Sequence, residues 1–133
     1  THLIPSILHS SGSTPLSIYG NDWPTKDGTP TRDFVHLNDL VDALVKSLNH
    51  LESLGHQIIN LGTANGTTVL EMVLAAEKAL NKKINYKFAS RRAGDSYALV
   101  TSNSKAKQTL NWQPNRNIID ILQDANSELL ANH

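Results

Sequence analysis

Two arginines, a glycine and an aspartate stand together after a predicted strand and could form an anion site. Arg91 and Arg92 follow a segment that alternates as strands do, and Gly94 and Asp95 come next. A guanidinium offers a planar fork of donors that suits phosphate oxygens, an aspartate can accept from sugar hydroxyls, and a glycine lets the backbone approach a ligand. A cluster of solvated charges is the alternative interpretation of these residues.

A third arginine, Arg32, stands at the end of a long loop, directly before another predicted strand. It would supply a second positive fork beside Arg92 if the two segments meet in space. Alternatively, Arg32 forms a structural ion pair with Asp33 or Asp39. The sequence therefore predicts a diphosphate site that depends on the convergence of Arg32 and Arg92.

The segment 62–66 begins and ends with glycine and lies between a predicted strand and a predicted helix. Helix N-termini offer free N–H groups to anions, but the spacing here fits neither the G-x-G-x-x-G fingerprint nor a P-loop. We interpret the segment as a turn before a capped helix, and a role in lining a nucleotide pocket is the alternative.

Other kinds of chemistry find no support in the residue pattern. The six histidines show no metal-ligand spacing, and no serine lies in a Gly-x-Ser-x-Gly sequence. The sequence predicts no metal site and no hydrolase nucleophile.

Composition indicates one ordinary globular domain, since 39% of the 133 residues are hydrophobic and 18% are charged. Twelve basic residues balance twelve acidic ones, which disfavours binding to nucleic acid or to a membrane surface. No apolar run approaches the roughly 20 residues of a membrane span. There is no cysteine, which fits the cytoplasm.

Hydrophobic periodicity predicts helices mixed with short strands, and therefore a small α/β layer arrangement. The predicted strands cover residues 16–19, 34–36, 57–61 and 84–88, and the predicted helices cover 3–9, 38–55, 68–80, 102–110 and 117–130. A cap by Asn38 or Asp39 is expected for the second helix, and a capping box of Thr68 and Glu71 for the third. The second helix has an apolar stripe formed by Leu40, Val41, Leu44, Val45, Leu48 and Leu51.

The order of these segments resembles the C-terminal part of the UDP-glucose 4-epimerase family, within the extended short-chain dehydrogenase/reductase group. The Pro-Thr-Lys-Asp-Gly-Thr loop at 24–29 and Arg-Arg-Ala-Gly-Asp at 91–95 are the more specific motifs. Arg-Asp-Phe-Val-His at 32–36 and Asn-Leu-Gly at 60–62 are shared across the group. The resemblance implies a mixed α/β UDP-sugar-binding domain over 1–133, with the Rossmann domain missing from this chain.

The resemblance also carries nucleotide contacts of the family onto this sequence. Ser17 and Tyr19 would hold the uracil base on the strand 16–19. Arg32 and Arg92 would grip the pyrophosphate and its ribose, and Asp95 would accept from the ribose hydroxyls.

Three further positions follow from the same resemblance. Phe34 would pack near the nucleotide, and Leu3 would touch it, although epimerases usually carry Asn where this chain has His2. Leu99 would line the hexose pocket, where its bulk would crowd an N-acetyl group. This favours plain UDP-glucose and UDP-galactose as substrates.

The family's cofactor and catalytic groups belong to the other part of the fold. Its N-terminal Rossmann domain holds NAD, and a Tyr-x-x-x-Lys pair moves the proton, whereas no tyrosine of this chain has a lysine four positions later. We therefore expect no catalytic and no NAD-binding residue here, and an isolated chain without isomerase activity. The only methionine is Met72, so we expect a preceding segment.

The resemblance implies that the full-length protein is a cytoplasmic homodimer that interconverts UDP-galactose and UDP-glucose through a 4-keto intermediate. Two alternatives remain open. One is another nucleotide-sugar enzyme of the group, a 4,6-dehydratase or a UDP-glucuronate decarboxylase. The other is a non-catalytic ligand-binding or interaction module whose arginines are solvated charges.

Overall fold

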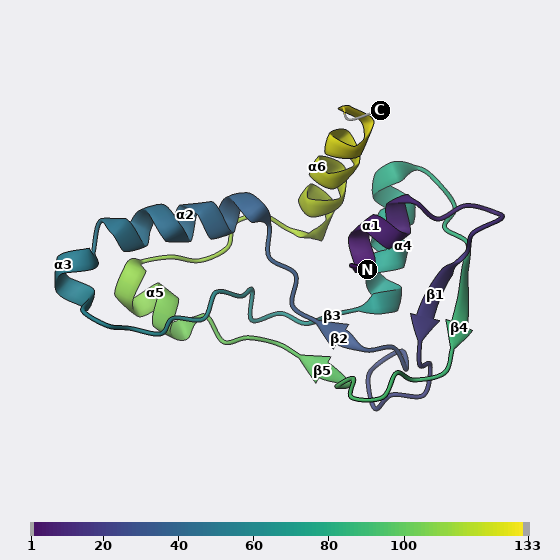
Figure 1. Cartoon of the computed structure of the whole chain (residues 1–133), viewed down its shortest axis with the longest axis horizontal. Helices are drawn as coiled ribbons and strands as arrows, with labels where there is room; N and C mark the ends of the chain where they lie inside the picture. Colours follow the sequence, from purple (N-terminus) through teal and green to yellow (C-terminus); the bar gives the residue numbers. More distant parts are fainter. Residues whose placement is uncertain (1, 132–133) are drawn as a thin grey trace.

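The fold combines short helices with two small sheets, as the sequence predicted (Figure 1). The computed structural model describes residues 2–131, apart from the side chains of residues 53 and 54, so the predicted domain 1–133 exceeds it by three terminal residues. The helices are α1 (Leu3–Leu8), α2 (Leu37–Leu48), α3 (Leu51–Leu54), α4 (Val69–Leu80), α5 (Ser104–Leu110) and α6 (Ile118–Ala131). The strands are β1 (Leu16–Tyr19), β2 (Thr31–Arg32), β3 (Thr67–Thr68), β4 (Tyr86–Ala89) and β5 (Ala98–Leu99).

Each sheet joins segments that are far apart in the sequence. Strand β1 pairs in parallel with β4, with Leu16 opposite Tyr86. Strand β2 lies in the centre of the second sheet, antiparallel to β3 and parallel to β5, and this register sets Arg32 beside Leu99. The three strands with predicted binding residues, β1, β2 and β5, are thereby fixed by long-range pairing.

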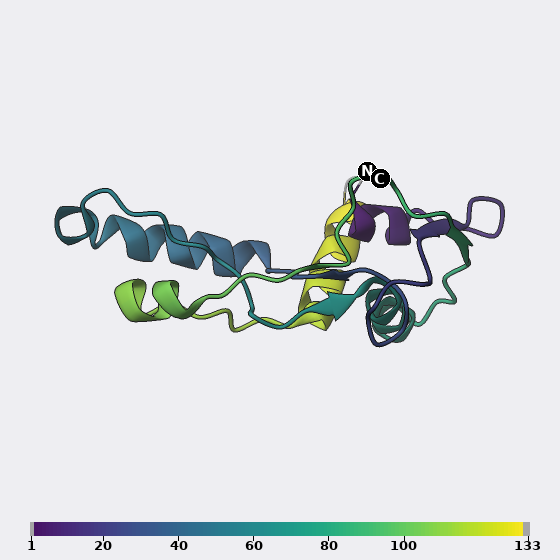
Figure 2. The ribbon, with the colours of Figure 1, turned by 90° about the horizontal axis from the view of Figure 1, so that it is seen from below.

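The described residues form two separate hydrophobic clusters. The main one lies among α1, α4, α6 and β1, and its buried members are Ile7, Leu16, Ile18, Met72, Val73, Ala75, Ala76, Ile84 and Leu122. The second is small and contains Ala43, Ala106, Leu110 and Trp112. It belongs to an arm, residues 37–61 and 104–112, that extends away from the main cluster (Figures 1 and 2).

The start of α2 differs from the prediction in two ways. The strand predicted at 34–36 is wrong, because residues 31–32 take the ladder hydrogen bonds between β3 and β5 and the chain then turns toward α2. The predicted cap by Asn38 or Asp39 is wrong as well. His36 is the N-cap, since its Nδ1 accepts from the backbone N–H of Asn38 at 3.1 Å.

The remaining elements of the arm correct two more predictions. The helix predicted over 38–55 ends at Leu48, and α3 starts only at Leu51. Its stripe does not face the core, because Val41, Leu44, Val45, Leu48 and Leu51 are 46–63% exposed. No strand forms at 57–61, because no described segment pairs its backbone with those residues.

The helix after the glycine turn is confirmed in position and in its cap. Thr68 accepts from the backbone N–H of Glu71 at 3.1 Å, and the Glu71 carboxylate accepts from the N–H of Thr68 at 2.9 Å. This reciprocal pair satisfies two donors that would otherwise be unpaired at the helix start. The capping box thus holds α4 in place beside β2.

Candidate ligand pocket

A pocket of about 680 Å³ lies among α1, β1, β2 and the loop after β4. Six of the seven predicted binding residues line it, namely Ser17, Tyr19, Arg32, Phe34, Arg92 and Asp95. Its size falls within the range of small-molecule sites, roughly 300–1,000 Å³. The structure therefore gathers three separate sequence segments around one hollow.

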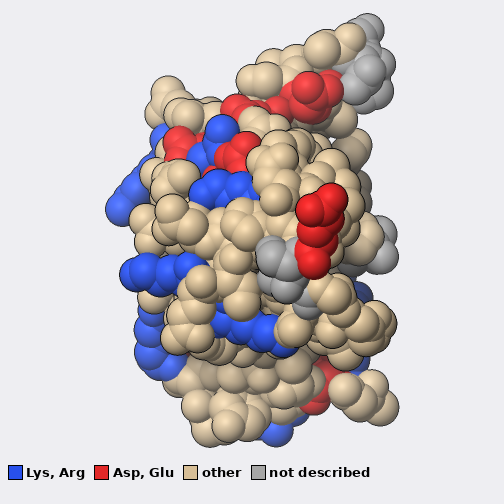
Figure 3. Space-filling model, turned by 90° about the vertical axis from the view of Figure 1, so that its left-hand side faces the viewer, with Lys and Arg blue, Asp and Glu red and all other residues tan. Residues whose placement is uncertain are grey.

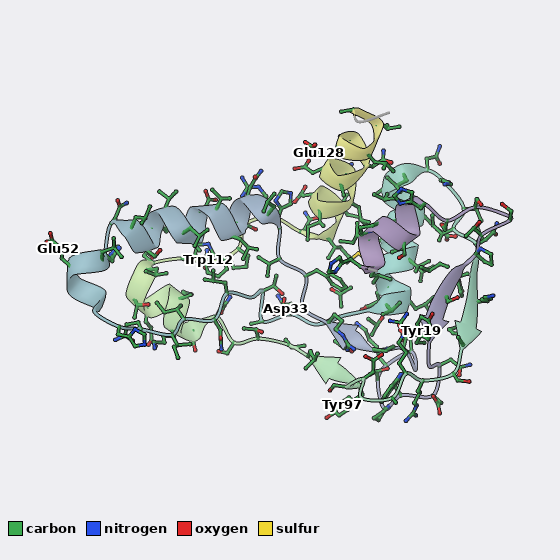
Figure 4. All side chains as sticks on the ribbon, viewed as in Figure 1. Tyr19, Asp33, Glu52, Tyr97, Trp112 and Glu128 are labelled. Carbon is green, nitrogen blue, oxygen red and sulfur yellow. The ribbon has the colours of Figure 1, made fainter. Side chains whose placement is uncertain are left out.

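Alternation along β1 explains how Ser17 and Tyr19 come to face this pocket. Successive side chains of a strand point to opposite sides. All four residues of β1 border the pocket, but Leu16 and Ile18 are buried in the main cluster, whereas Ser17 and Tyr19 are half-buried and leave polar groups accessible to a ligand. Figure 4 shows Tyr19 at β1, among the side chains of the neighbouring loops.

Arg92 stacks on the aromatic ring of Tyr19. Its guanidinium carbon lies 3.5 Å from the ring centroid. The guanidinium also lowers the pKa of the Tyr19 phenol, first through hydrogen bonding and then through its charge. This contact orients an exposed cation over the pocket, where it can meet an anionic ligand.

Arg32 is held by backbone carbonyl groups, whereas Arg92 is held by an aromatic ring. One guanidinium nitrogen, Nη1, donates to the carbonyl oxygens of Thr31 at 2.8 Å and Ser96 at 2.9 Å. The other, Nη2, lies 4.0 Å from the Asp95 carboxylate. The predicted alternative of an ion pair with Asp33 or Asp39 is not found, and Arg32 keeps donors that face the pocket.

A tight turn after Arg92 places Asp95 beside Arg32. The backbone N–H of Asp95 donates to the carbonyl of Arg92 at 3.2 Å, and Gly94 adopts φ +83°. This φ lies in the region that favours glycine. The Arg-Arg-Ala-Gly-Asp motif therefore works as a turn that brings its acid next to Arg32.

Arg91 points away from the pocket, which the sequence did not reveal. Its Nε donates to the Asp22 carboxylate at 2.8 Å, its Nη2 donates to the Asp22 carbonyl at 2.6 Å, and its guanidinium lies 4.1 Å from the Trp23 ring centroid. The two adjacent arginines thus have different partners. Arg91 fixes the loop after β1, and Arg92 faces the hollow.

The same loop is tied to β1 by Trp23. The indole N–H donates to the carbonyl of Tyr19 at 3.2 Å. Gly20 permits this approach, since a Cβ at that position would stand 2.2 Å from the indole nitrogen and its φ is +88°. The ring of Tyr19 is therefore supported by a turn that depends on glycine, tryptophan and Arg91.

The Pro-Thr-Lys-Asp-Gly-Thr loop is anchored on α4. The Asp27 carboxylate accepts from the N–H of Thr29 at 2.9 Å, from its hydroxyl at 2.7 Å, and from the hydroxyl of Thr68. Burial acts to raise the pKa of Asp27, but these hydrogen bonds outweigh it and lower the pKa. Lys26 pairs with Glu71 of the capping box. The motif's polar residues hold the loop rather than line the pocket.

Asp33 lines the pocket, but its carboxylate is engaged in internal hydrogen bonds. Its carboxylate accepts from the backbone N–H groups of Thr63 at 3.0 Å and Thr101 at 3.1 Å. A Cβ on Gly62 would stand 2.6 Å from the same carboxylate. The glycine turn 62–66 therefore closes against Asp33, and none of its residues lines the pocket.

Leu99 is the predicted binding residue that the pocket does not include. It lies on β5 beside Arg32 and is 58% exposed. Its proposed contact with a hexose remains a prediction. Leu3 and His2 do line the pocket, together with His9 of the turn after α1.

Two features are absent from the part of the chain that the structure describes. No group of three or more His, Asp or Glu side chains there is arranged to hold a metal ion. No helix there has the length and apolar content to span a bilayer.

We predict that the two arginines control the pKa values of different groups. Arg91 lowers the pKa of the Asp22 carboxylate, mainly by hydrogen bonding. In Arg91→Ala the pKa of Asp22 should rise toward that of a free carboxylate, while the pKa of Tyr19 stays unchanged. In Arg92→Ala the pKa of Tyr19 should rise toward that of a free phenol, while the pKa of Asp22 stays unchanged. NMR titration of both groups measures this, and equal effects of both variants would contradict the division of roles.

The Arg91 contact also has a defined pH dependence. Since the pKa of Asp22 is lower in the folded chain than in the unfolded one, the contact stabilises the fold above the ordinary carboxylate pKa. This stabilisation is lost as the pH falls through the lowered value. The acid side of a thermal-melting profile should therefore be flatter in Arg91→Ala than in the wild type.

The sequence of this chain is similar to those of known nucleotide-sugar enzymes. A family model described as GDP-mannose 4,6 dehydratase matches residues 12–125. A UDP-glucose 4-epimerase of Bacillus subtilis is 45% identical over 111 residues, which are 83% of this chain and 33% of the relative. One of Lacticaseibacillus casei is 40% identical over 137 aligned residues, covering 100% of this chain and 41% of the relative.

Solved structures give the same result. The UDP-glucose 4-epimerase of Stenotrophomonas maltophila, crystallised with NAD and formylated UDP-arabinopyranose, aligns with 99% of this chain and 40% of its own at a TM-score of 0.93 and 30% identity. The predicted resemblance to epimerases of the extended short-chain group is thereby confirmed. This chain spans about a third to two fifths of the lengths of these relatives.

Proposed function

Because this chain belongs to the GDP-mannose 4,6-dehydratase family, we propose that it is the UDP-sugar-binding portion of a UDP-glucose 4-epimerase. The proposed domain spans 1–133. In the complete enzyme, an isomerase, it would hold UDP-galactose and UDP-glucose while C4 is oxidised and reduced. The chain alone is proposed to be inactive.

The observation that carries this proposal is the shared pocket of Arg32 and Arg92. Two guanidinium groups from segments 60 residues apart line one hollow, together with Asp95, which lies 4.0 Å from Arg32. A diphosphate fits such a pair, because each fork can make charge-assisted hydrogen bonds. The Tyr19 ring and the half-buried Ser17 beside it suit a base and its polar edge.

This arrangement suits the chemistry of an epimerase. The sugar must turn between hydride removal and return, so tight contacts belong on the remote nucleotide and not on the reacting ring. NAD would be the hydride carrier and would be held by the remainder of the enzyme. The role of this chain would be to position the substrate. It would bind the diphosphate and make few contacts with the hexose.

The wider setting is part of the proposal. The complete protein is proposed to be a cytoplasmic homodimer that binds neither nucleic acid nor membrane. The absence of cysteine supports the cytoplasm, and the balance of charges argues against binding to nucleic acid or membrane. The homodimer is proposed from the family resemblance.

A 4,6-dehydratase is the second candidate, since the matching family model carries that description. A chimera separates the two: this chain replaces the corresponding part of the L. casei relative, and the product formed from UDP-galactose is identified. We expect UDP-glucose. Since the catalytic groups of the chimera come from the relative, this chain decides only which nucleotide sugar is held. A folded chimera that binds GDP-mannose in preference to UDP-galactose would favour the dehydratase.

A further inference from the structure

The charged side chains that line the pocket cancel one another. Arg32 and Arg92 supply two positive charges. Asp33 and Asp95 supply two negative ones. The rest of the chain does not tip this balance, since twelve basic residues face twelve acidic ones and both signs appear on the face at the tip of the arm (Figure 3). The pocket therefore has no net formal charge to set against an anionic ligand.

A nucleotide diphosphate ester would bring two negative charges into this pocket, one on each phosphate group. A charge that leaves water without a full counter-charge costs free energy. An anion also favours the charged form of a neighbouring basic group. A pocket side chain that takes up a proton on binding would therefore supply the missing positive charge.

Three further side chains of the pocket lining can change their charge, namely His2, His9 and Tyr19. Tyr19 can only become an anion, which would oppose binding. Histidine is the side chain that ordinarily changes charge between pH 5 and 8, and its protonated form is a cation. The two histidines are thus the groups that can balance a bound anion.

The two histidines stand at opposite ends of α1. This helix begins at its end toward β2, the strand of Arg32, and runs away from it (Figure 1). The histidines are seven positions apart, which corresponds to about 10 Å along a helix. Beside His9, Lys82 donates to the carbonyl of Ser10 at 3.2 Å, and a nearby cation disfavours a second one. His2 is the better placed of the two.

The fold around His2 does not depend on the protonation state of its ring. Its side chain makes no capping hydrogen bond to α1, and the residue is exposed. Only its carbonyl group holds the helix start, since it accepts from the N–H of Ser6 at 3.2 Å and from the Ser6 hydroxyl at 2.8 Å. The imidazole can therefore gain a proton without loss of a capping contact.

No further charge from the neighbouring helices enters the pocket. Helices α4 and α6 pack against α1, but among the described residues no charged side chain of either helix belongs to the pocket lining. The charged groups that share the pocket with His2 are therefore the two arginines and the two aspartates. A bound diphosphate would be the largest change in its electrostatic surroundings.

We propose that His2 takes up a proton from solvent when the pocket binds a nucleotide diphosphate ester, and that it then forms a third cationic contact beside Arg32 and Arg92. The inference rests on the proposed function, which supplies the ligand. The imidazolium donates to a phosphate oxygen, as both of its ring nitrogens carry a proton. Binding then strengthens as the pH falls from 8 to 6.

Calorimetric titration of the chimera with UDP-glucose tests this coupling. The diphosphate of UDP-glucose is esterified at both ends, so it has no group of its own that titrates near neutral pH. Titrations at pH 7 in phosphate and in Tris, which differ in their heats of ionisation, give the number of protons taken up. We expect uptake in the wild type and its loss in His2→Asn. Between pH 8 and pH 6 the Kd of the wild type should fall roughly tenfold more than that of His2→Asn, which is the effect of a shift by one pH unit.

Three variants control this experiment. His2→Gln should behave as His2→Asn does, since neither amide titrates. His9→Asn should lose less uptake than His2→Asn. His56→Asn should keep the wild-type uptake, because His56 is an exposed histidine of the arm and is outside the pocket lining. All four variants should melt near the wild-type temperature, because none of the replaced side chains is buried.

Three results would overturn this inference and leave the proposed function in place. They are binding of UDP-glucose without proton uptake, uptake that both His2 variants retain, and uptake that is lost in His9→Asn instead. Failure of the folded wild-type chimera to bind UDP-glucose at any pH is a different outcome. It would contradict the proposed function itself, and this inference with it.

Discussion

Arg92→Ala in the chimera with the L. casei relative is expected to raise the KM for UDP-galactose roughly 10- to 150-fold. That range corresponds to the loss of hydrogen bonds to a charged group, about 1.5–3 kcal/mol. Since the diphosphate is held alike in the ground and transition states, kcat should change little. Steady-state kinetics of the galactose-to-glucose conversion measures both constants.

Two variants control this experiment. Lys87→Ala removes a positive charge from the same exposed segment but not from the pocket lining, and its KM should stay near the wild-type value. Arg92→Lys keeps the charge and loses the planar fork, so an intermediate KM is expected. An unchanged KM in Arg92→Ala would remove Arg92 from the binding site.

Asp39→Ala is expected to destabilise the fold by roughly 2–3 kcal/mol, which is the scale for losing hydrogen bonds to a buried charged group. The carboxylate is 1% exposed and accepts from three donors. These are the backbone N–H groups of Asn115 at 3.2 Å and Arg116 at 3.1 Å, and the Arg116 guanidinium at 2.6 Å. The two backbone N–H groups would lose their acceptor, and Arg116 would keep only the exposed Asp42. Chemical denaturation measures the change.

Asp42 provides the matched control for that experiment. It is one turn further along α2, its side chain is 53% exposed, and it contacts the same Arg116 at 3.4 Å. Exposed pairs contribute about 0–1 kcal/mol, so Asp42→Ala should change the free energy of unfolding by less than about 1 kcal/mol. Equal losses in both variants would show that Asp39 does not act as the buried anchor of the 115–116 backbone.

Much of the pocket was predictable because its elements are local. Alternation along 16–19 separates Ser17 and Tyr19 from the buried Leu16 and Ile18, and this requires only that the strand has one buried face. The capping box at Thr68 is likewise formed by residues three apart. The resemblance supplied the pairing of Arg32 with Arg92, which residue types alone left open.

The predictions for the arm were wrong for a common reason. Periodicity identifies the apolar face of α2 but not which body covers it, and here that face points outward. The same holds for 57–61, whose pattern is that of a strand although no described segment pairs with it. Both patterns describe surfaces for which the described residues contain no partner.

The sequence alone determined which chemical groups are present and where helices and turns begin, since propensity, capping and alternation act over a few residues. The tertiary structure decided which partner each group has. Arg91 and Arg92 are adjacent, yet one binds Asp22 and the other stacks on Tyr19. Asp39 meets Arg116 across 77 positions. Contacts of that range depend on how the chain folds back on itself, and no local pattern encodes them.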